Sequence, residues 1–565
     1  MKTRLSLLAT TATVCMLSCV QAPVPDAGIA LFGSFSYSGA DTCYIHHPLT
    51  EENAFYNPIL PGWYSDPSVC TNGKGDYFLV TSTFSYYPGV PIFHSRDLMH
   101  WEQVGHVLDR PSQLRNLPPQ HVSGGIFAPA IEYNPHNETY YMVTTNVGWG
   151  NFFVTTKDPF GEWSEPIRLP TVGGIDPSFF FDDDGRAYIV NNDDAPDRKA
   201  EYDGHRTIRI QEFDPATNRT VGDRKILVNK GARPEDNPIW IEGPHMYKIN
   251  GKYYLMSAEG GTGGWHSEVI FRSDSPMGPF EPWEKNPILT QRHLDHKRSY
   301  PITCAGHADL VQAKEGDWWA VFLACRPIEN KFENLGRETF IMPVKWSDDG
   351  FPYMTQGDDI VPLIVHRDGV KRQDGYATAG NFTHTDEFAD TLLAQDWHTL
   401  RGPATEHYSL TAVPGYLALK CAPKLSTERG TPAFVGRRMQ HHAFESNTDM
   451  LFAPADTLER AGMVLFKDET HQYLFIVGYD GTNKYISLEK VGRQGTEALA
   501  RHALTEQSPA ITLKVVSDGK HYAFHYATKK GRWQTLAEEV DAAHLSTARA
   551  GGFTGSLIGL YATNK

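Results

Sequence analysis

The sequence is poor in cysteine and in basic charge, and each shortage excludes a class of protein. Seven cysteines in 565 residues are too few for a disulfide scaffold. The later cysteines show no metal-ligand spacing, so we expect buried apolar thiols, with Cys304 and Cys325 as one candidate disulfide pair. A formal net charge of -15 argues against nucleic acid or an anionic membrane surface as a partner, because both attract basic proteins.

Long apolar runs and long amphipathic helices are not evident either. Two basic residues precede an apolar run from Leu5 to Leu17, which is the layout of a secretory signal in residues 1–22 and is too short for a convincing membrane span. Residues 16–19 resemble a relaxed bacterial lipobox, in which Cys19 would carry a lipid anchor. Ordinary cleavage at the end of this segment is the alternative. Both routes predict an exported protein, either periplasmic or anchored to the bacterial cell envelope.

Several active-site signatures are missing. The sequence has no Gly-rich phosphate loop, no zinc-ligand spacing and no Ser-His-Asp motif. Nucleotide-dependent, zinc-dependent and serine-hydrolase chemistry is therefore not indicated.

One hairpin pattern is present in five copies. Its clearest copy, GIDPSFFFDDDGRAYIV from Gly174, has an apolar strand, a turn of acidic residues with glycine, and a return strand. The other copies start at Ser65, Phe127, Glu242 and Gly306. A second hairpin follows each copy, which gives about four strands per unit. Such repeats are typical of a β-propeller, so we predict an all-β chain with five blades in residues 51–365.

The remaining sequence predicts a second domain. Residues 366–380 are expected to be a linker, and residues 23–50 a leader before the propeller. From residue 381 the repeat disappears, and segments such as GMVLFKD and YISLEKVG alternate apolar and polar residues. Period-2 strands at short spacing indicate a β-sandwich of the jelly-roll type over residues 381–565.

Aligning the five copies identifies candidate catalytic residues. The position before the template proline, or before its alanine replacement, holds Asp66, Ala128, Asp176, Gly243 and His307, and Glu242 lies one residue earlier than Gly243. The innermost strands of a propeller start near its axis, so these side chains should meet at one end of the channel. An isolated Asp-Pro pair is most often a turn or strand start.

The coincidence of three carboxylates favours a catalytic interpretation. Like charges brought together are costly unless one is protonated, and a protonated and an ionised carboxyl are what glycoside hydrolysis needs. A third carboxylate near the acid can raise the pKa of the acid by charge repulsion. Six aromatic residues near template starts or loop tips are candidates for stacking on a sugar, although each is more often a core residue: Trp63, Phe84, Tyr86, Phe127, Trp149 and Trp265.

Longer motifs stand in a fixed order along the chain. They are NPILPGWYSDPSV (57–69), YYPGVPIFHSRDLMHW (86–101), GGIDPSFFFDDDG (173–185), IEGPHMYKINGKYYL (241–255), GHADLV (306–311), LGRETF (335–340), DEF (386–388), AGMVLFKDETHQY (461–473) and GGFTGSLIGLYAT (551–563). This set resembles the glycoside hydrolases of family 43, and in particular their β-xylosidase branch. The resemblance implies a five-bladed propeller followed by a concanavalin A-like sandwich.

The resemblance also implies roles for individual residues. Asp66 matches the general base, Glu242 the general acid, and Asp176 the carboxylate that tunes and orients the acid. Arg337 matches an arginine that contacts sugar hydroxyls. His307 matches an axial histidine beneath the site, where a structural histidine is as consistent as a ligand to water or to a metal ion such as calcium; no cofactor is required.

A substrate follows from the same resemblance. It implies an exo-acting, inverting β-xylosidase that releases xylose from the non-reducing ends of xylo-oligosaccharides, with an α-L-arabinofuranosidase as the alternative in the same class. Phe127 stands where many relatives have tryptophan, which leaves the shape of the sugar subsite open. A non-catalytic carbohydrate-binding protein is the alternative of another class, although it would have no need of all three carboxylates.

Overall fold

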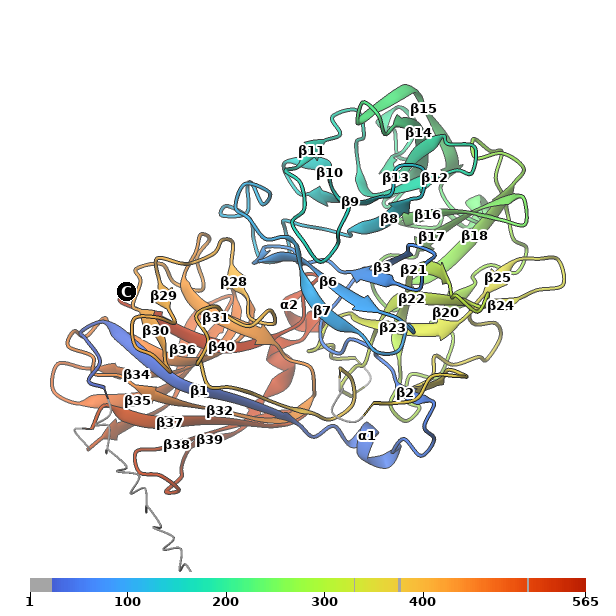
Figure 1. Ribbon diagram of the computed structural model, residues 1–565. Coiled ribbons are helices and arrows are strands. Elements are labelled where there is room, and N and C mark those ends of the chain that lie inside the picture. Colours follow the sequence, from blue (N-terminus) through green and yellow to red (C-terminus); the bar gives the residue numbers. More distant parts are fainter. Residues whose placement is uncertain (1–22, 330, 374–377, 506–507) are drawn as a thin grey trace, which may run out of the picture.

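The computed structural model describes residues 23–329, 331–373, 378–505 and 508–565, and it shows two β-rich lobes joined side by side (Figure 1). The predicted signal and Cys19 lie outside the described residues. The α-helices of the described part are short, α1 (Thr42–His46) and α2 (Thr547–Ala550). None of the described helices is long and apolar enough to cross a membrane. The predicted all-β class is confirmed.

One lobe consists of sheets whose strands follow each other in chain order, as propeller blades do. Blade 1 joins β3 (Ser68–Thr71), β4 (Tyr77–Val80), β6 (Gly89–Ser95) and β7 (Glu102–Leu108). Blade 2 joins β8 (Ala130–Asn134), β9 (Thr139–Asn146), β10 (Gly150–Thr156) and β11 (Ile167–Arg168). Blade 3 joins β12 (Ile175–Phe181), β13 (Ala187–Asp194), β14 (Arg206–Asp214) and β15 (Arg219–Asn229).

The last two blades are less regular than the repeat predicted. Blade 4 joins β16 (Glu242–Ile249), β17 (Lys252–Glu259), β18 (Ser267–Ser273) and β19 (Glu281–Pro282), and β20 (Leu289–Thr290) also pairs with β18. The sheet of blade 5 has three strands instead of the expected four, β21 (Thr303–Gln312), β22 (Trp318–Cys325) and β23 (Glu338–Pro343). The following β24 (Lys345–Trp346) and β25 (Pro352–Tyr353) pair with each other.

The five blades close into a ring. Each innermost strand contacts the next, from β3 through β8, β12, β16 and β21 and back to β3. The ends of the ring are joined by a bridge between Leu60 and Thr339, and by pairing of β2 (Ala54–Tyr56) with β26 (Ile364–His366). The five-bladed propeller is therefore confirmed, and the starts of its inner strands surround one channel.

The other lobe is a sandwich of two antiparallel sheets. One has the order β29 (Tyr408–Ser409), β30 (Leu417–Lys420), β1 (Ile29–Gly39), β32 (Ala443–Leu451), β37 (Ala510–Asp518), β38 (His521–Ala527) and β39 (Gln534–Asp541), and β27 (Thr383–Asp386) also pairs with β1. The other has the order β31 (Ala433–Arg438), β40 (Leu557–Thr563), β33 (Arg460–Asp468), β34 (His471–Tyr479), β35 (Lys484–Gly492) and β36 (Gly495–Leu504).

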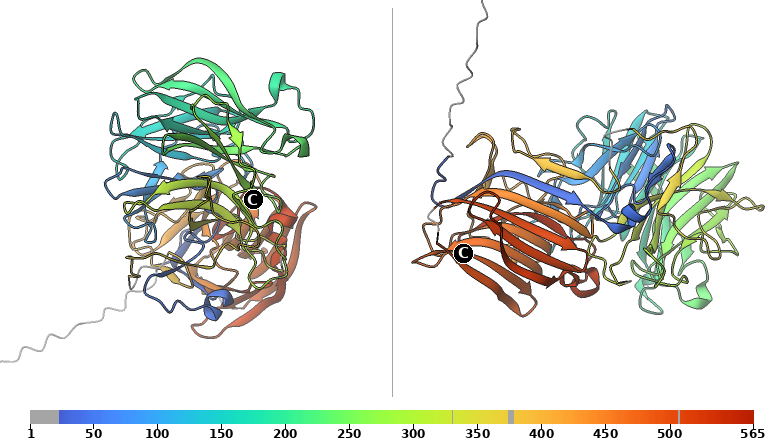
Figure 2. Two further views of the ribbon diagram at one scale, coloured as in Figure 1. Left: turned by 90° about the vertical axis from the view of Figure 1, so that its right-hand side faces the viewer. Right: turned by 90° about the horizontal axis from the view of Figure 1, so that it is seen from below.

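The position of β1 corrects the predicted domain order. Residues 23–50 were expected to form a leader, but β1 lies inside the first sandwich sheet, where Phe35 pairs with Thr448 and with Asp386. Figure 2 shows this strand running along the sandwich, next to strands from the far end of the chain. The described part of the chain therefore runs from the sandwich into the propeller and back to the sandwich.

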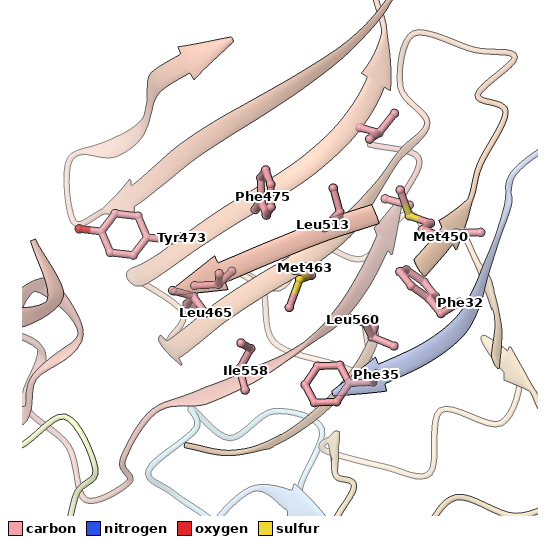
Figure 3. Packing of buried hydrophobic residues seen from close by; sticks show 14 of the residues in the cluster. Phe32, Phe35, Met450, Met463, Leu465, Tyr473, Phe475, Leu513, Ile558 and Leu560 are labelled. Carbon is pink, nitrogen blue, oxygen red and sulfur yellow. The ribbon is translucent and has the colours of Figure 1, made fainter. Parts of the chain in front are cut away.

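The sandwich core comes from the inward-facing residues of both sheets. Phe32 and Phe35 from β1 and Leu513 from β37 pack against residues of β33, β34 and β40, and all are buried (Figure 3). Buried residues alternate with partly buried ones along β37, so one face of this strand packs into the core.

Two of the predicted sugar platforms belong to the interface between the lobes. Trp63 and Tyr86 are both 0% exposed. The guanidinium group of Arg438, from β31, lies 4.2 Å from the centroid of the Trp63 ring, and its Nε donates to the Trp63 carbonyl at 2.9 Å. Next to them, β5 (Tyr86–Tyr87) pairs with β28 (Thr399–Leu400) of the sandwich. The stacking role for both residues is wrong, because the second lobe covers them.

The candidate disulfide is not formed. Among the described residues, Cys304 and Cys325 are free, buried thiols. Cys325 pairs in register with Thr303 rather than with Cys304. The other three described cysteines are also free and buried, in agreement with the apolar role expected for them.

Candidate active site

The aligned template position adopts an unusual backbone conformation. Asp66, Asp176, Gly243 and His307 all have positive φ angles, between 52° and 55°. Non-glycine residues adopt this left-handed conformation infrequently, and aspartate and histidine tolerate it better than most. The inner strands shift register there, between Ile175 and Ser178 in blade 3 for example. The repeat therefore builds the same turn in four blades at the channel end.

Gly243 explains why the carboxylate of blade 4 is displaced by one residue. A Cβ atom at Gly243 would lie 2.6 Å from Nε2 of His307, which is closer than side chains approach. Blade 4 therefore needs glycine where blades 1 and 3 have aspartate. The acid is instead supplied by Glu242, the first residue of β16.

The predicted residues converge on one pocket. It has a volume of about 490 Å³ and is lined by Asp66, Phe84, Phe127, Ala128, Ile175, Asp176, Arg206, Trp240, Glu242, Gly261, Thr262, His307, Arg337 and Phe553. The lining includes the three carboxylates, Arg337 and His307, and two of the six aromatic candidates, Phe84 and Phe127. The carboxylates come from blades 1, 3 and 4, as the alignment predicted.

Asp66 lies in surroundings that favour its ionised form. Arg337 Nη1 donates to its Oδ1 at 2.9 Å and Nη2 to its Oδ2 at 3.5 Å, while the Ser82 hydroxyl donates to Oδ2. His307 Nδ1 lies 3.7 Å from Oδ1. Burial opposes ionisation, but these partners outweigh it and hold the pKa of Asp66 below the ordinary value.

Glu242 and Asp176 have the opposite character. Burial raises the pKa of Glu242 to about 8, and the charge of Asp176 adds to this effect. Burial and the charge of Asp66 raise the pKa of Asp176, whose Oδ2 accepts a hydrogen bond from the Gly243 amide at 3.2 Å. The two groups titrate as a coupled pair. The pocket therefore holds an ionised carboxylate in blade 1 and a protonated carboxyl in blade 4 near neutral pH.

Three aromatic rings from both lobes form one wall. Phe84 lies near-parallel to Phe553 with centroids 6.1 Å apart, and Phe127 meets both rings edge-on. The Phe553 ring lies 5.6 Å from the guanidinium of Arg337, and its amide donates to Ser123 Oγ at 3.0 Å. The sandwich thus supplies part of the pocket.

Comparison with known proteins identifies this arrangement. The family model for glycosyl hydrolases family 43 matches residues 55–352, and the model for the β-xylosidase C-terminal concanavalin A-like domain matches residues 385–565. The chain belongs to glycoside hydrolase family 43. It is an enzyme of that family, so the non-catalytic alternative is wrong.

Several relatives match over nearly their full length. A xylosidase/arabinosidase of Butyrivibrio fibrisolvens is 40% identical, over 90% of this chain and 95% of the relative. A non-reducing end α-L-arabinofuranosidase of Bacteroides ovatus is 36% identical, over 91% and 92%. The structure of a GH43_12 protein from a capybara gut metagenome is 42% identical with a TM-score of 0.88, covering 95% of this chain and all of that one.

The family 43 pocket also contains residues that the sequence reasoning missed. Arg206 begins β14, donates to Asp194 and Asn192, and faces the pocket without belonging to any repeated motif. Trp240 lies two residues before Glu242, next to a template start. This position could have identified it from the sequence as a pocket residue. Phe553 falls within the motif GGFTGS, but no residue pattern links that segment to the propeller.

The other two aromatic candidates lie outside the pocket. Trp149 is partly buried, with the guanidinium of Arg168 5.0 Å from its ring centroid. Trp265 is 73% exposed and lines a separate cavity.

The residues around His307 do not form a metal-ligand set. Calcium takes six to eight oxygen ligands, and within the described ranges no group of three or more His, Cys, Asp or Glu side chains is arranged to hold a metal ion. Burial lowers the pKa of His307 to about 4, so its imidazole is neutral at neutral pH. His307 instead contacts Asp66 and fills the space opposite Gly243.

Proposed function

We propose that this enzyme is an exo-acting, inverting β-xylosidase that releases xylose from the non-reducing ends of xylo-oligosaccharides. The observation that carries the proposal is the opposite perturbation of two carboxyl groups in one pocket. Asp66 is held ionised by Arg337 and Ser82, whereas Glu242 is held protonated by burial and by Asp176. Such a pair supplies a general base and a general acid at the same pH.

In the proposed mechanism both proton transfers use these side chains. Glu242 donates its proton to the glycosidic oxygen as the bond to the anomeric carbon breaks. Asp66 accepts a proton from a water molecule, whose oxygen attacks the anomeric carbon from the opposite face. Attack opposite the leaving group inverts the configuration at that carbon. Asp176 transfers no proton but keeps Glu242 protonated, and the mechanism needs no cofactor.

The shape of the pocket supports release of terminal sugars. The aromatic wall of Phe84, Phe127 and Phe553 closes one side, and Phe553 comes from the sandwich. A closed wall leaves room for a chain end rather than for a chain that passes through. A relative from Bacteroides ovatus is named as a non-reducing end enzyme, which is consistent with this geometry.

An α-L-arabinofuranosidase is the second candidate. The names of the relatives from Butyrivibrio fibrisolvens and Bacteroides ovatus include arabinose-releasing activity, whereas a 32% identical relative from Bacillus subtilis is named a β-xylosidase. The same acid and base serve both reactions, so the choice depends on which sugar fits the pocket.

The test compares the two sugars directly. The full chain is assayed on aryl β-D-xyloside, aryl α-L-arabinofuranoside and xylo-oligosaccharides, with products separated by chromatography and the first-formed anomer read by proton NMR. We expect xylose to dominate, released as the α-anomer from β-linked substrates. Dominant release of arabinose would replace the first candidate by the second, and β-xylose as the first product would exclude inversion.

We also propose that the protein is exported and anchored through Cys19. The support is the N-terminal sequence alone, with two basic residues, an apolar run and a lipobox-like ending. Expression of the full chain and of Cys19→Ala in a bacterial host, followed by fractionation, tests this. Membrane association that persists in Cys19→Ala would exclude the anchor.

A further inference from the structure

An exposed apolar rim beside the catalytic pocket has no role in the mechanism above. Trp265 is 73% exposed, Ile239 40% and Trp240 39%. They lie on two neighbouring loops, residues 237–240 and 260–265, which are joined by a hydrogen bond of 2.9 Å from the Gly260 amide to the Ile239 carbonyl. Apolar side chains that stay exposed in a group mark binding surfaces.

The rim separates two cavities. Trp240, Gly261 and Thr262 line the catalytic pocket. Their immediate neighbours in the same loops, Ile239 and Gly260, line a second cavity of about 460 Å³ together with Trp265. A chain that leaves the catalytic pocket across this rim therefore enters the second cavity.

Trp240 is held in place with its backbone strained. Its φ is 53°, which is an outlier for a bulky residue, and its amide donates to the Gly204 carbonyl at 2.8 Å. The guanidinium of Arg206 lies 5.1 Å from the ring centroid, and Arg206 is itself fixed by Asp194 at 2.5 Å. Strained residues persist where the surroundings over-determine them, and they cluster at functional sites. Here the strained ring stands two residues from Glu242.

The second cavity suits a neutral ligand rich in hydroxyl groups. It is lined by hydrogen-bond donors on Arg233 and Arg292 and by acceptors on Asp236 and Glu259. These donors and acceptors can hydrogen-bond to hydroxyl groups. Because two basic and two acidic side chains balance each other, the cavity does not favour an ion of either sign. The exposed Trp265 ring adds an apolar face. Aromatic surface with a few placed polar groups is typical of sites that bind small molecules.

We infer that this rim and cavity bind the leaving-group part of an oligosaccharide. The terminal sugar occupies the catalytic pocket, the next sugar contacts Trp240, and a third lies against Trp265. The preferred substrates then contain at least three sugars. The inference rests on the glycosidase function proposed above, because the sugar in the pocket fixes the direction of the chain.

Chain-length dependence tests the inference. kcat/KM is measured on xylo-oligosaccharides of two to six units for the wild type, for Trp265→Ala and for Trp533→Ala. Trp533 is 42% exposed on the sandwich and serves as a matched control for loss of a surface tryptophan. We expect the ratio of tetrasaccharide to disaccharide kcat/KM to fall about five- to tenfold in Trp265→Ala, the usual cost of truncating an aromatic contact, and to keep its wild-type value in Trp533→Ala.

Two results would overturn the inference and one would overturn the function itself. An unchanged ratio in Trp265→Ala excludes the third sugar contact. In the Glu242→Gln background, calorimetric affinity for a tetrasaccharide that is the same with and without Trp265→Ala also excludes it. If the wild type instead releases no sugar from any of these substrates, the proposed activity fails, whatever Trp265 does.

Discussion

Replacing Asp176 by asparagine should shift the basic limb of the pH–rate profile. Glu242 must be protonated to act as an acid, so activity is lost as pH rises through its pKa, which burial and Asp176 raise to about 8. Asparagine removes the charge of Asp176 while its side-chain carbonyl can still accept the hydrogen bond from the Gly243 amide. The pKa of Glu242 then falls, and the basic limb moves to lower pH.

The expected change in the pKa of Glu242 depends on which of the two causes, burial or the charge of Asp176, contributes more to it. The pKa of Glu242 is raised from 4.5 to about 8, burial is the largest cause, and burial stays in the variant. The charge of Asp176 ranks second to burial, so we expect the pKa of Glu242 in the variant to fall by about one unit, which corresponds to about 1.4 kcal/mol between its two protonation states. The acid limb belongs to Asp66. The acid limb should stay in place, because the pKa of Asp176 is raised to about 7 and Asp176 carries no charge in the pH range where Asp66 titrates.

The assay is kcat/KM on an oligosaccharide between pH 4 and pH 10. Asp182→Asn is the matched control, because Asp182 is a buried acid just after β12 that pairs with Lys248 and Tyr253 outside the pocket. We expect its basic limb to coincide with that of the wild type. An Asp176→Asn profile of reduced height with an unmoved basic limb would refute the reasoning and leave Asp176 a positioning role.

Three further substitutions examine the other groups of the pocket. Glu242→Gln should lose far more kcat on oligosaccharides than on aryl glycosides with good leaving groups, which need little protonation; equal losses would argue against an acid. Ser82→Ala removes a hydrogen bond to the ionised Asp66, so the acid limb should move to higher pH by about one unit, and an unmoved limb would contradict that contribution. Phe553→Ala should lower kcat/KM roughly tenfold by opening the aromatic wall; wild-type values would show that the sandwich does not shape the site.

Much of the catalytic arrangement could be predicted because it is encoded locally and repeated. The copies in blades 1 and 3 place an aspartate before a proline at the start of an inner strand, blade 4 places Glu242 one residue earlier, and closure of the ring brings these starts together. The one-residue offset of Glu242 was visible in the alignment. Its cause was not, since it depends on the approach of His307 to Gly243 across the channel.

The failures share a different physical origin, which is contact between segments far apart in the chain. The alternating pattern of β1 identifies a strand but not its partner, and the strand pairs with residues more than 400 positions away. Trp63, Tyr86 and Phe84 are all buried aromatic residues near template starts, but only Phe84 lines the pocket, where its ring lies against Phe553 of the sandwich. Arg206 is paired by register with Asp194, a cross-strand contact that no single-strand pattern reveals.

The sandwich is best understood as part of the active site rather than as an appended module. Phe553 lies in a loop whose next residues are held by hydrogen bonds. The Thr554 carbonyl accepts a hydrogen bond from the buried Lys467 side chain. The Ser556 amide donates to the Asn334 carbonyl of the propeller at 2.9 Å. Lys467 also donates to Thr547 at 3.0 Å. Because Asn334 lies three residues before Arg337, the same contact that docks the sandwich also holds the loop segment before β23 that supplies the partner of Asp66. The aromatic wall and the contact of Arg337 with Asp66 are therefore both supported by one interface between the two lobes.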